Sequence, residues 1–209
     1  RHPYPSCQTR LTSAKIAPMN TVKVLIEGYA KVNPDGTWDA TSTTTLIDTG
    51  KHKIIMDPGC HRQLLLEALA REGLEKGDID TVFISHYHPD HCLLMGCFEN
   101  ATVFDSIQWQ KGPIGGETKD TLPDTNIQII KTPGHAPEHA SLLVAASEGK
   151  VLVGADVFWW RAGEEQKIDI SKHDDFASDQ KTLQLSRSLA LKIADYIIPG
   201  HGKMFSVQK

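Results

Sequence analysis

The chain has 209 residues, of which 40% are hydrophobic and 23% are charged. These proportions are ordinary for a globular domain and exclude a largely disordered chain, and the length suits one hydrophobic core better than two. The formal net charge is −4, and lysine and arginine form no block. The general electrostatic footprint of a nonspecific nucleic-acid binder is therefore missing.

Cysteines and hydrophobic runs narrow the class further. The four cysteines form no CxxC pair, which argues against a disulfide scaffold and a cysteine-based zinc finger. No apolar run approaches the roughly 18 residues of a membrane span, and residues 1–20 lack the apolar centre of a signal peptide. We therefore expect a reduced cytoplasmic protein without a membrane partner. Residues 1–20 are expected to be a leader or expression-derived segment, and residues 21–209 a single domain.

The first part of the domain has the alternating pattern of strands. Strands are predicted over residues 22–26, 43–48 and 53–57, and Asn33-Pro34-Asp35-Gly36 is typical of a hairpin turn. A helix follows over residues 62–71, where leucines and alanines recur with helical spacing. This order predicts an antiparallel meander that leads into a helix.

A strand that runs into a tight turn and a residue of metal-ligating type then recurs along the chain. These strands are predicted over residues 81–85, 127–130, 151–154 and 196–200, and they lead to His86, His135, Asp156 and His201. A rigid sheet can hold ligands at strand ends and leave them open to a cleft. With a second helix expected over about residues 179–194, the class is mixed α/β in layers.

The stretch His86-Tyr87-His88-Pro89-Asp90-His91 carries the most chemical information. His86 and His88 are two residues apart, so at a strand end both imidazoles point the same way and can share one cation. Pro89 disfavours a helical conformation at His88, which excludes the helix-borne HExxH geometry. Asp90 and His91 lie just beyond and could begin a second site. Imidazole and carboxylate together suit Zn²⁺, with iron or manganese also feasible.

Taken singly, these residues have ordinary explanations. An isolated His-x-His pair is more often incidental than a metal site, and His135 or His201 alone would be interpreted as a capping or hydrogen-bonding residue. Three histidines and an aspartate within six residues are hard to explain by packing, because they place polar groups at the end of an apolar strand. Together with His135 and His201, the cluster favours a metal site.

Five motifs, in this order and spacing, carry a family resemblance. They are Ile54-Ile55-Met56-Asp57-Pro58-Gly59, His86 to His91, Thr132-Pro133-Gly134-His135, Gly154-Ala155-Asp156 and Pro199-Gly200-His201-Gly202. Over residues 22–205 the chain resembles the metallo-β-lactamase superfamily, and within it the small subfamily of metallo-β-lactamase domain-containing protein 1. The resemblance implies an αββα sandwich with its site at one edge of the sheets.

The same resemblance implies a site with two Zn²⁺ ions. His86, His88 and His135 would bind the first metal; Asp90, His91 and His201 would bind the second; and Asp156 would bridge them. Asp57 would fix the metal-binding loop through hydrogen bonds without being a ligand. The implied mechanism is attack by a metal-bridging hydroxide on an ester, lactone or phosphodiester, with Asp90 orienting the nucleophile and accepting its proton.

Several alternatives stay open within and outside this class. Asp156 is similar to the bridging residue of glyoxalase II, the lactonases and the ribonuclease branch, and true β-lactamases lack it. A glyoxalase II-like thioesterase and a mono-iron persulfide dioxygenase-like enzyme are rivals, although the complete second ligand set argues against a single iron. A non-enzymatic, metal-stabilised binding protein is the alternative from another class, but structural zinc sites are usually rich in cysteine.

Four residues near the expected ligands are candidate substrate contacts. Trp159 and Trp160 could stack on a base, an aromatic ring or a lactone, and Arg161 and Lys203 could hold an anionic group; core packing and solvated charge are the alternatives. The glycine-rich segment over residues 105–125 could act as a lid over the substrate. The expected partner is a small ester or phosphodiester, with RNA or DNA as alternatives, and a homodimer stays open.

Overall fold

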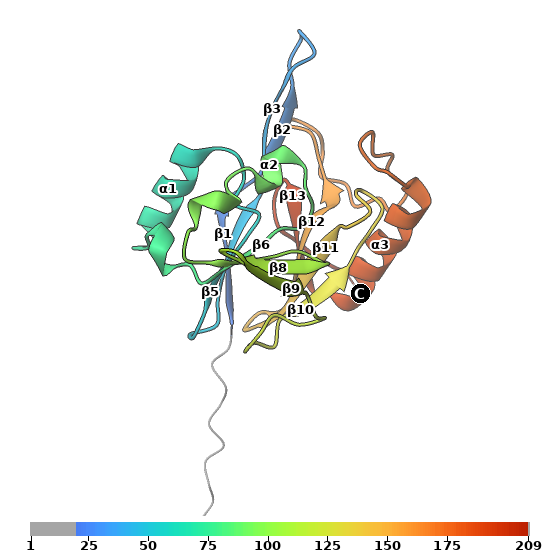
Figure 1. The fold of residues 1–209 in the computed structure, drawn as a ribbon. Helices are drawn as coiled ribbons and strands as arrows, with labels where there is room; N and C mark the ends of the chain where they lie inside the picture. Colours follow the sequence, from blue (N-terminus) through green and yellow to red (C-terminus); the bar gives the residue numbers. More distant parts are fainter. Residues whose placement is uncertain (1–19, 209) are drawn as a thin grey trace, which may run out of the picture.

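The computed structural model describes residues 20–208 (Figure 1). The predicted leader lies outside the described residues except for Asn20, and it stays a prediction. Among the helices of residues 20–208, none is both long enough and apolar enough to cross a membrane.

Two β-sheets form the centre of the fold. The seven-stranded sheet has the order β1-β4-β5-β6-β7-β8-β9. Its strands are β1 Thr21–Ile26, β4 Thr44–Asp48, β5 Lys53–Met56, β6 Thr81–Phe83, β7 Thr102–Phe104, β8 Gln108–Lys111 and β9 Ile114–Glu117. The five-stranded sheet, in sequence order, consists of β10 Gln128–Lys131, β11 Ala140–Ala146, β12 Gly149–Trp159, β13 Tyr196–His201 and β14 Phe205–Ser206.

The remaining elements are a hairpin and short or covering helices. Strands β2 Tyr29–Val32 and β3 Trp38–Thr41 pair with each other and form a hairpin that projects from one end of the sandwich (Figure 1). The helices are α1 Arg62–Arg71, α2 Pro89–Cys92 and α3 Gln180–Ile193, with 3-10 turns η1 Lys76–Asp78 and η2 Met95–Cys97. Figure 1 places α1 and α3 on opposite outer sides of the two sheets.

Apolar side chains point to both faces of each sheet, because successive residues of a strand point to opposite faces. In β5, Ile54 and Met56 belong to the core between the two sheets, whereas Ile55 packs with residues of α1. In β12, Val153 faces the other sheet and Leu152 packs toward α3. The layers are therefore helix, sheet, sheet and helix, and the predicted αββα sandwich is confirmed.

Both covering helices begin where the sequence predicted. The side chain of His61 accepts a hydrogen bond from the backbone N–H of Leu64 at the start of α1. Asp179 caps α3 by accepting from the N–H groups of Lys181 and Thr182. Each cap satisfies donors that the first helical turn leaves without an intrahelical partner.

The interpretation of residues 105–125 as a lid is wrong. Strands β8 and β9 occupy this segment and pair with each other as an antiparallel hairpin at the edge of the seven-stranded sheet. None of its residues lines the cleft described below. The glycines that suggested a mobile loop, Gly115 and Gly116, instead lie on β9 against Gln110 and Trp109 of β8.

Candidate metal centre

Residues of metal-ligating type converge at one end of the two sheets. His86 follows β6, and His88 is the extended N-cap of α2, with Pro89 at the first helical position. Asp156 and His201 lie on the parallel neighbours β12 and β13. The residues able to hold a metal form two groups: His86, His88, His135 and Asp156, and Asp90, His91 and His201.

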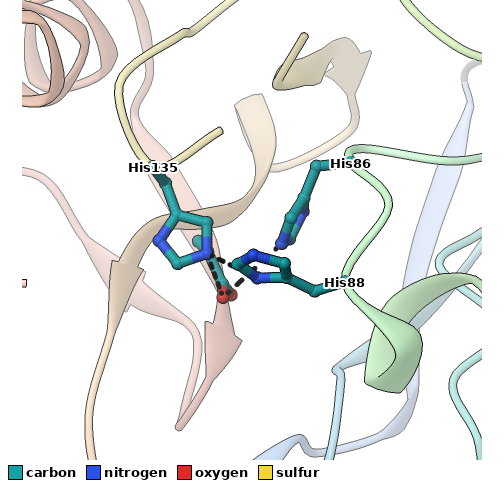
Figure 2. Close-up of side chains that lie close together, drawn as sticks. His86, His88 and His135 are labelled. Atoms are coloured by element: carbon teal, nitrogen blue, oxygen red, sulfur yellow. Dashed lines mark hydrogen bonds and ion pairs between the residues drawn. The ribbon is translucent and has the colours of Figure 1, made fainter. Parts of the chain in front are cut away.

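The first group surrounds one oxygen of Asp156. Its Oδ2 lies 3.2 Å from His135 Nε2 and 3.9 Å from His86 Nε2. His135 Nε2 also lies 3.0 Å from His88 Nδ1. Figure 2 shows the three imidazoles pointing toward one another. Three nitrogens and one carboxylate oxygen therefore face a common point.

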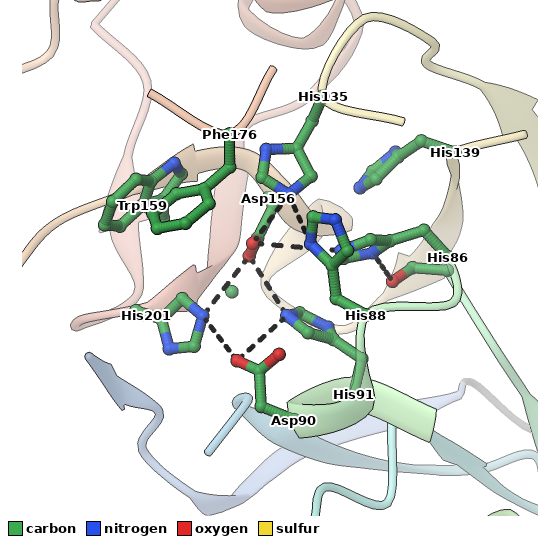
Figure 3. A network of polar contacts seen from close by, with 12 residues as sticks. His86, His88, Asp90, His91, His135, His139, Asp156, Trp159, Phe176 and His201 are labelled. Atoms are coloured by element: carbon green, nitrogen blue, oxygen red, sulfur yellow. Dashed lines mark hydrogen bonds and ion pairs between the residues drawn. The ribbon is translucent and has the colours of Figure 1, made fainter. Parts of the chain in front are cut away.

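The second group meets the other oxygen of the same carboxylate. Asp156 Oδ1 lies 3.3 Å from His91 Nε2 and 3.7 Å from His201 Nε2. Asp90 Oδ2 closes this group at 3.3 Å from His201 Nε2 and 3.9 Å from His91 Nε2 (Figure 3). Asp156 thus presents one oxygen to each group.

Unpartnered buried atoms show that these groups fit a cation. His86 Nε2, His91 Nε2 and Asp156 Oδ1 are buried and lack a hydrogen-bond partner. A buried polar atom without a hydrogen bond costs about 1–3 kcal/mol, and these atoms lie around the two oxygens of Asp156, where cations would satisfy them. Imidazole nitrogens and carboxylate oxygens are the donors that zinc, iron and manganese accept. The protein therefore has a metal-binding site built from histidines and aspartates.

Burial and neighbouring charges shift the pKa values of Asp156, His86 and His91. Burial alone would raise the pKa of this carboxyl, but His91, His201 and His135 outweigh burial and hold the pKa well below its usual value. Burial lowers the pKa of His86, so that its imidazole is neutral, the form that binds metals. Burial would also lower the pKa of His91, but the carboxylates of Asp156 and Asp57 outweigh it and raise the pKa.

Asp57 contacts the metal-binding loop through His91 and Ser85, in line with the role that the family resemblance implies for it. Its Oδ2 lies 2.8 Å from His91 Nδ1 and accepts a hydrogen bond of 2.6 Å from Ser85 Oγ. Its Oδ1 accepts from the backbone N–H of Ser85 at 2.8 Å. Ser85 Oγ lies 2.9 Å from His86 Nδ1, so one buried serine connects the carboxylate to the first group. Sequence reasoning missed Ser85, because a serine at the end of a strand carries no distinctive signal.

Comparison with known proteins identifies the family. The profile of the metallo-beta-lactamase superfamily matches residues 38–107. Metallo-beta-lactamase domain-containing protein 1 of Xenopus laevis is 31% identical over 200 residues, which cover 91% of this chain and 83% of the relative. The chain belongs to the metallo-β-lactamase superfamily.

Two more distant comparisons agree with this assignment. A hydroxyacylglutathione hydrolase of Albidiferax ferrireducens is 27% identical over 52% of this chain and 44% of that protein. The crystal structure of a putative metallo-beta-lactamase from Thermotoga maritima has a TM-score of 0.68 and 23% identity, and the match covers 90% of this chain and 99% of that one. The second comparison shows that the fold is shared.

At two glycines of the superfamily motifs, this structure leaves no room for a side chain. A Cβ at Gly200 would lie 1.7 Å from Asp156 Oδ1, although the φ angle of Gly200 is not positive. Gly134 has φ +128°, and a Cβ there would lie 2.2 Å from the backbone nitrogen of Leu183 in α3. Side chains at these positions would displace Asp156 and the loop that carries His135.

A cleft of about 560 Å³ opens over the two groups of this superfamily member. His88, Asp90, His135 and His201 line its floor, and 24% of the side-chain surface of Asp90 is accessible. The walls come from the β2–β3 hairpin, from Leu93 after α2 and from the segment before α3. The site is therefore open to a small molecule from the hairpin side.

The four predicted substrate contacts separate into two pairs. Trp159 and Arg161 line the cleft. Trp160 is buried on the other side of β12, where it stacks on Phe158, and it does not line the cleft. Lys203 is exposed outside the cleft lining. The structure therefore does not place Trp160 or Lys203 at the cleft. Trp159 ends β12 and Trp160 follows it directly, so the two indole rings lie on opposite faces of the sheet.

Two buried residues lie near His135 beside the predicted ligands. The Nδ1 atom of His139 lies 2.9 Å from Thr132 Oγ1, and its ring centroid lies 5.1 Å from that of His86. Burial lowers the pKa of His139 to about 3, so the ring is neutral. Asp174 was not singled out at all, yet it contacts His135. It lies between β12 and α3, in a segment without helix or strand periodicity.

Proposed function

We propose that the chain is a hydrolase with two metal ions that cleaves a small ester, thioester or lactone carrying an apolar group. The observation that carries the proposal is the Asp156 carboxylate, which presents one oxygen to each of two ligand groups at the floor of an open cleft. Two cations held there, most simply zinc, would lower the pKa of a water molecule and polarise the carbonyl oxygen under attack.

Asp90 is the residue placed to act on the attacking water. It lies on the cleft floor, and its Oδ2 is 3.3 Å from His201 Nε2. Burial would raise the pKa of Asp90, but the hydrogen bond from His201 and the charge of His91 outweigh it, so the pKa is lowered. Asp90 is therefore ionised and can accept a hydrogen bond from the attacking water, which would orient it.

The cleft walls favour a small apolar substrate over a polyanion. Trp38, Val32, Leu93 and Phe176 line the cleft with large exposed side chains. The cations of the lining are Lys31 and Arg161, and Arg161 is already paired with Asp175 at the rim. Nucleic-acid binding depends on neutralising several phosphates at once. An apolar acyl or aromatic group beside the scissile carbonyl matches this surface better, and a thioester is supported by the hydroxyacylglutathione hydrolase relative.

The test compares substrate classes on one preparation. The zinc-loaded protein is incubated with p-nitrophenyl butyrate, an N-acyl homoserine lactone, an S-acyl thioester, bis-p-nitrophenyl phosphate and end-labelled single-stranded RNA. Asp90→Ala is the test variant, and Glu148→Ala, at an exposed carboxylate in the turn between β11 and β12, is the matched control.

We expect turnover of at least one carbonyl substrate that falls about 100-fold or more in Asp90→Ala and is unchanged in Glu148→Ala. Cleavage of RNA or the phosphodiester with no carbonyl turnover would overturn the substrate class. Carbonyl turnover that Asp90→Ala leaves intact would overturn the role of Asp90.

A further inference from the structure

We propose that Asp174 is a positioning residue that fixes His135 as a metal ligand and ties it to the aromatic wall of the cleft. This inference rests on the proposed metal centre, but it concerns a residue on a segment that carries none of the ligands. Asp174 is 1% exposed, and its side chain forms hydrogen bonds with three residues that line the cleft: His135, Trp159 and Phe176.

Three hydrogen bonds define the geometry of this carboxylate. Its Oδ2 lies 2.8 Å from His135 Nδ1 and accepts a 3.0 Å hydrogen bond from the indole N–H of Trp159. Its Oδ1 accepts from the backbone N–H of Phe176 at 2.9 Å. One side chain therefore joins a loop after β10, the end of β12 and the segment before α3.

The contact with His135 sets which ring nitrogen faces the metal site. An ionised carboxylate only accepts hydrogen bonds, so Nδ1 of His135 must carry the proton. Nε2 then has its lone pair free, and this atom lies 3.2 Å from Asp156 Oδ2 inside the first ligand group. Orientation of a histidine ligand by a carboxylate typically changes metal affinity by 10- to 100-fold.

The second ligand group contains the same arrangement, which supports the assignment. Asp57 Oδ2 lies 2.8 Å from His91 Nδ1, at the same distance as Asp174 from His135. His86 has Ser85 Oγ at its Nδ1, and a hydroxyl can donate or accept. Of the contacts described for the first group, that with Asp174 is the one that allows a single tautomer.

The same carboxylate holds the wall that a substrate would touch. Trp159 and Phe176 both line the cleft, and their ring centroids lie 5.8 Å apart. Phe176 also meets Trp38 of the β2–β3 hairpin edge to face at 6.1 Å. Figure 3 shows Trp159 and Phe176 beside His135 and Asp156. Loss of the Asp174 contacts would therefore loosen a metal ligand and the substrate wall together.

The variant Asp174→Asn tests whether the Asp174 carboxylate orients His135 or only anchors the loop. The amide has one acceptor oxygen in place of two. If that oxygen faces His135 and Trp159, the NH₂ group opposes the N–H of Phe176; in the flipped orientation, the NH₂ group opposes Nδ1–H of His135. Either orientation keeps the side-chain volume, and in both of them His135 loses the charged acceptor of its Nδ1–H.

The experiment measures Zn²⁺ bound per chain after equilibrium dialysis at a series of free zinc concentrations, and the visible spectrum of the Co²⁺-loaded protein. Test variants are Asp174→Asn and Trp159→Phe. Matched controls are Asp179→Asn, which keeps a good N-cap for α3, and Trp160→Phe, whose indole N–H donates to the carbonyl of Lys167 outside the cleft.

We expect Asp174→Asn to bind one of two zinc ions 10- to 100-fold more weakly and to shift the Co²⁺ spectrum, with a smaller shift in Trp159→Phe and none in the controls. Two zinc ions bound with wild-type affinity and an unchanged Co²⁺ spectrum in Asp174→Asn would overturn the inference. These readouts need no turnover, so the inference can stand if no carbonyl substrate is cleaved and the proposed function fails.

A measurement on the wild-type protein covers the case in which Asp174→Asn does not fold. Zinc-loaded protein with ¹⁵N-labelled histidine is examined by long-range ¹H–¹⁵N correlation. We expect His135 to be protonated at Nδ1 and bound to zinc through Nε2. Coordination of His135 through Nδ1 would overturn the inference.

Discussion

Gly200→Ala is expected to disable the metal site without disturbing the backbone of β13. The φ angle of Gly200 is not positive, so an L side chain is allowed, but its Cβ would lie 1.7 Å from Asp156 Oδ1. Contacts below 3.0 Å essentially never occur, so the carboxylate must move by more than about 1 Å. A displacement of that size typically costs about 100-fold in activity, or about 2.7 kcal/mol of transition-state stabilisation.

Two assays measure this effect, one of them independent of the substrate. Zinc bound per chain after dialysis should fall, because Asp156 is the residue shared by both ligand groups. The specific activity on the best carbonyl substrate should fall about 100-fold. Gly96→Ala is the control, because a Cβ at Gly96 meets nothing within 4 Å and its φ is not positive. Wild-type zinc content and activity in Gly200→Ala would refute the steric argument.

Three further predictions concern stability, the cleft wall and the metals. Arg187→Met should lower the free energy of unfolding by about 3 kcal/mol in urea denaturation, because the buried guanidinium donates to three backbone carbonyls; a loss under about 1 kcal/mol would contradict this. Trp38→Ala should raise KM for an aromatic ester about three- to tenfold at constant kcat, because Trp38 lines the cleft. The control Leu185→Ala, at a residue of similar exposure on α3, should change neither constant. A fall in kcat alone would refute a substrate-binding role of Trp38. Chelation with EDTA should lower Tm, and excess zinc should restore it, because zinc at 100 times its Kd stabilises the folded state by about 2.7 kcal/mol. A Tm that changes with neither EDTA nor zinc would contradict a bound metal.

The parts of the fold that were predictable are those whose local pattern agrees with their packing. Helix α1 was predicted over the same residues that it occupies, because its leucines and alanines recur on the face that covers the seven-stranded sheet. The ligand groups were predictable for another reason. His86 follows β6 and His201 ends β13, whereas Asp156 lies within β12, which continues to Trp159 beyond the strand predicted over residues 151–154. The parallel neighbours β12 and β13 bring Asp156 and His201 to the same end of the sheet.

The parts that could not be predicted depend on contacts between distant segments. Asp174 lies 39 residues from His135 along the chain, and nothing in its neighbourhood distinguishes it from Asp175, which is exposed and paired with Arg161. Strands β8 and β9 are short, and β9 carries two glycines and is exposed along its whole length. Hydrogen bonding to the edge of an existing sheet, more than burial of side chains, makes this segment a hairpin.

The origin of the ligands links metal binding to the stability of the sandwich. In the first group, His86 follows β6 of the seven-stranded sheet, and Asp156 lies on β12 of the five-stranded sheet. In the second group, His91 lies on α2, which follows β6, and His201 lies on β13 of the five-stranded sheet. Without a cation, buried nitrogens and a buried carboxylate oxygen face each other without hydrogen-bond partners, which opposes closure of the two sheets at this end. A cation held by these residues would satisfy these atoms and link the two sheets. Before metal binds, the apolar core between the sheets therefore has to offset the unfavourable free energy of these buried atoms. Metal binding would then add to the free energy of unfolding.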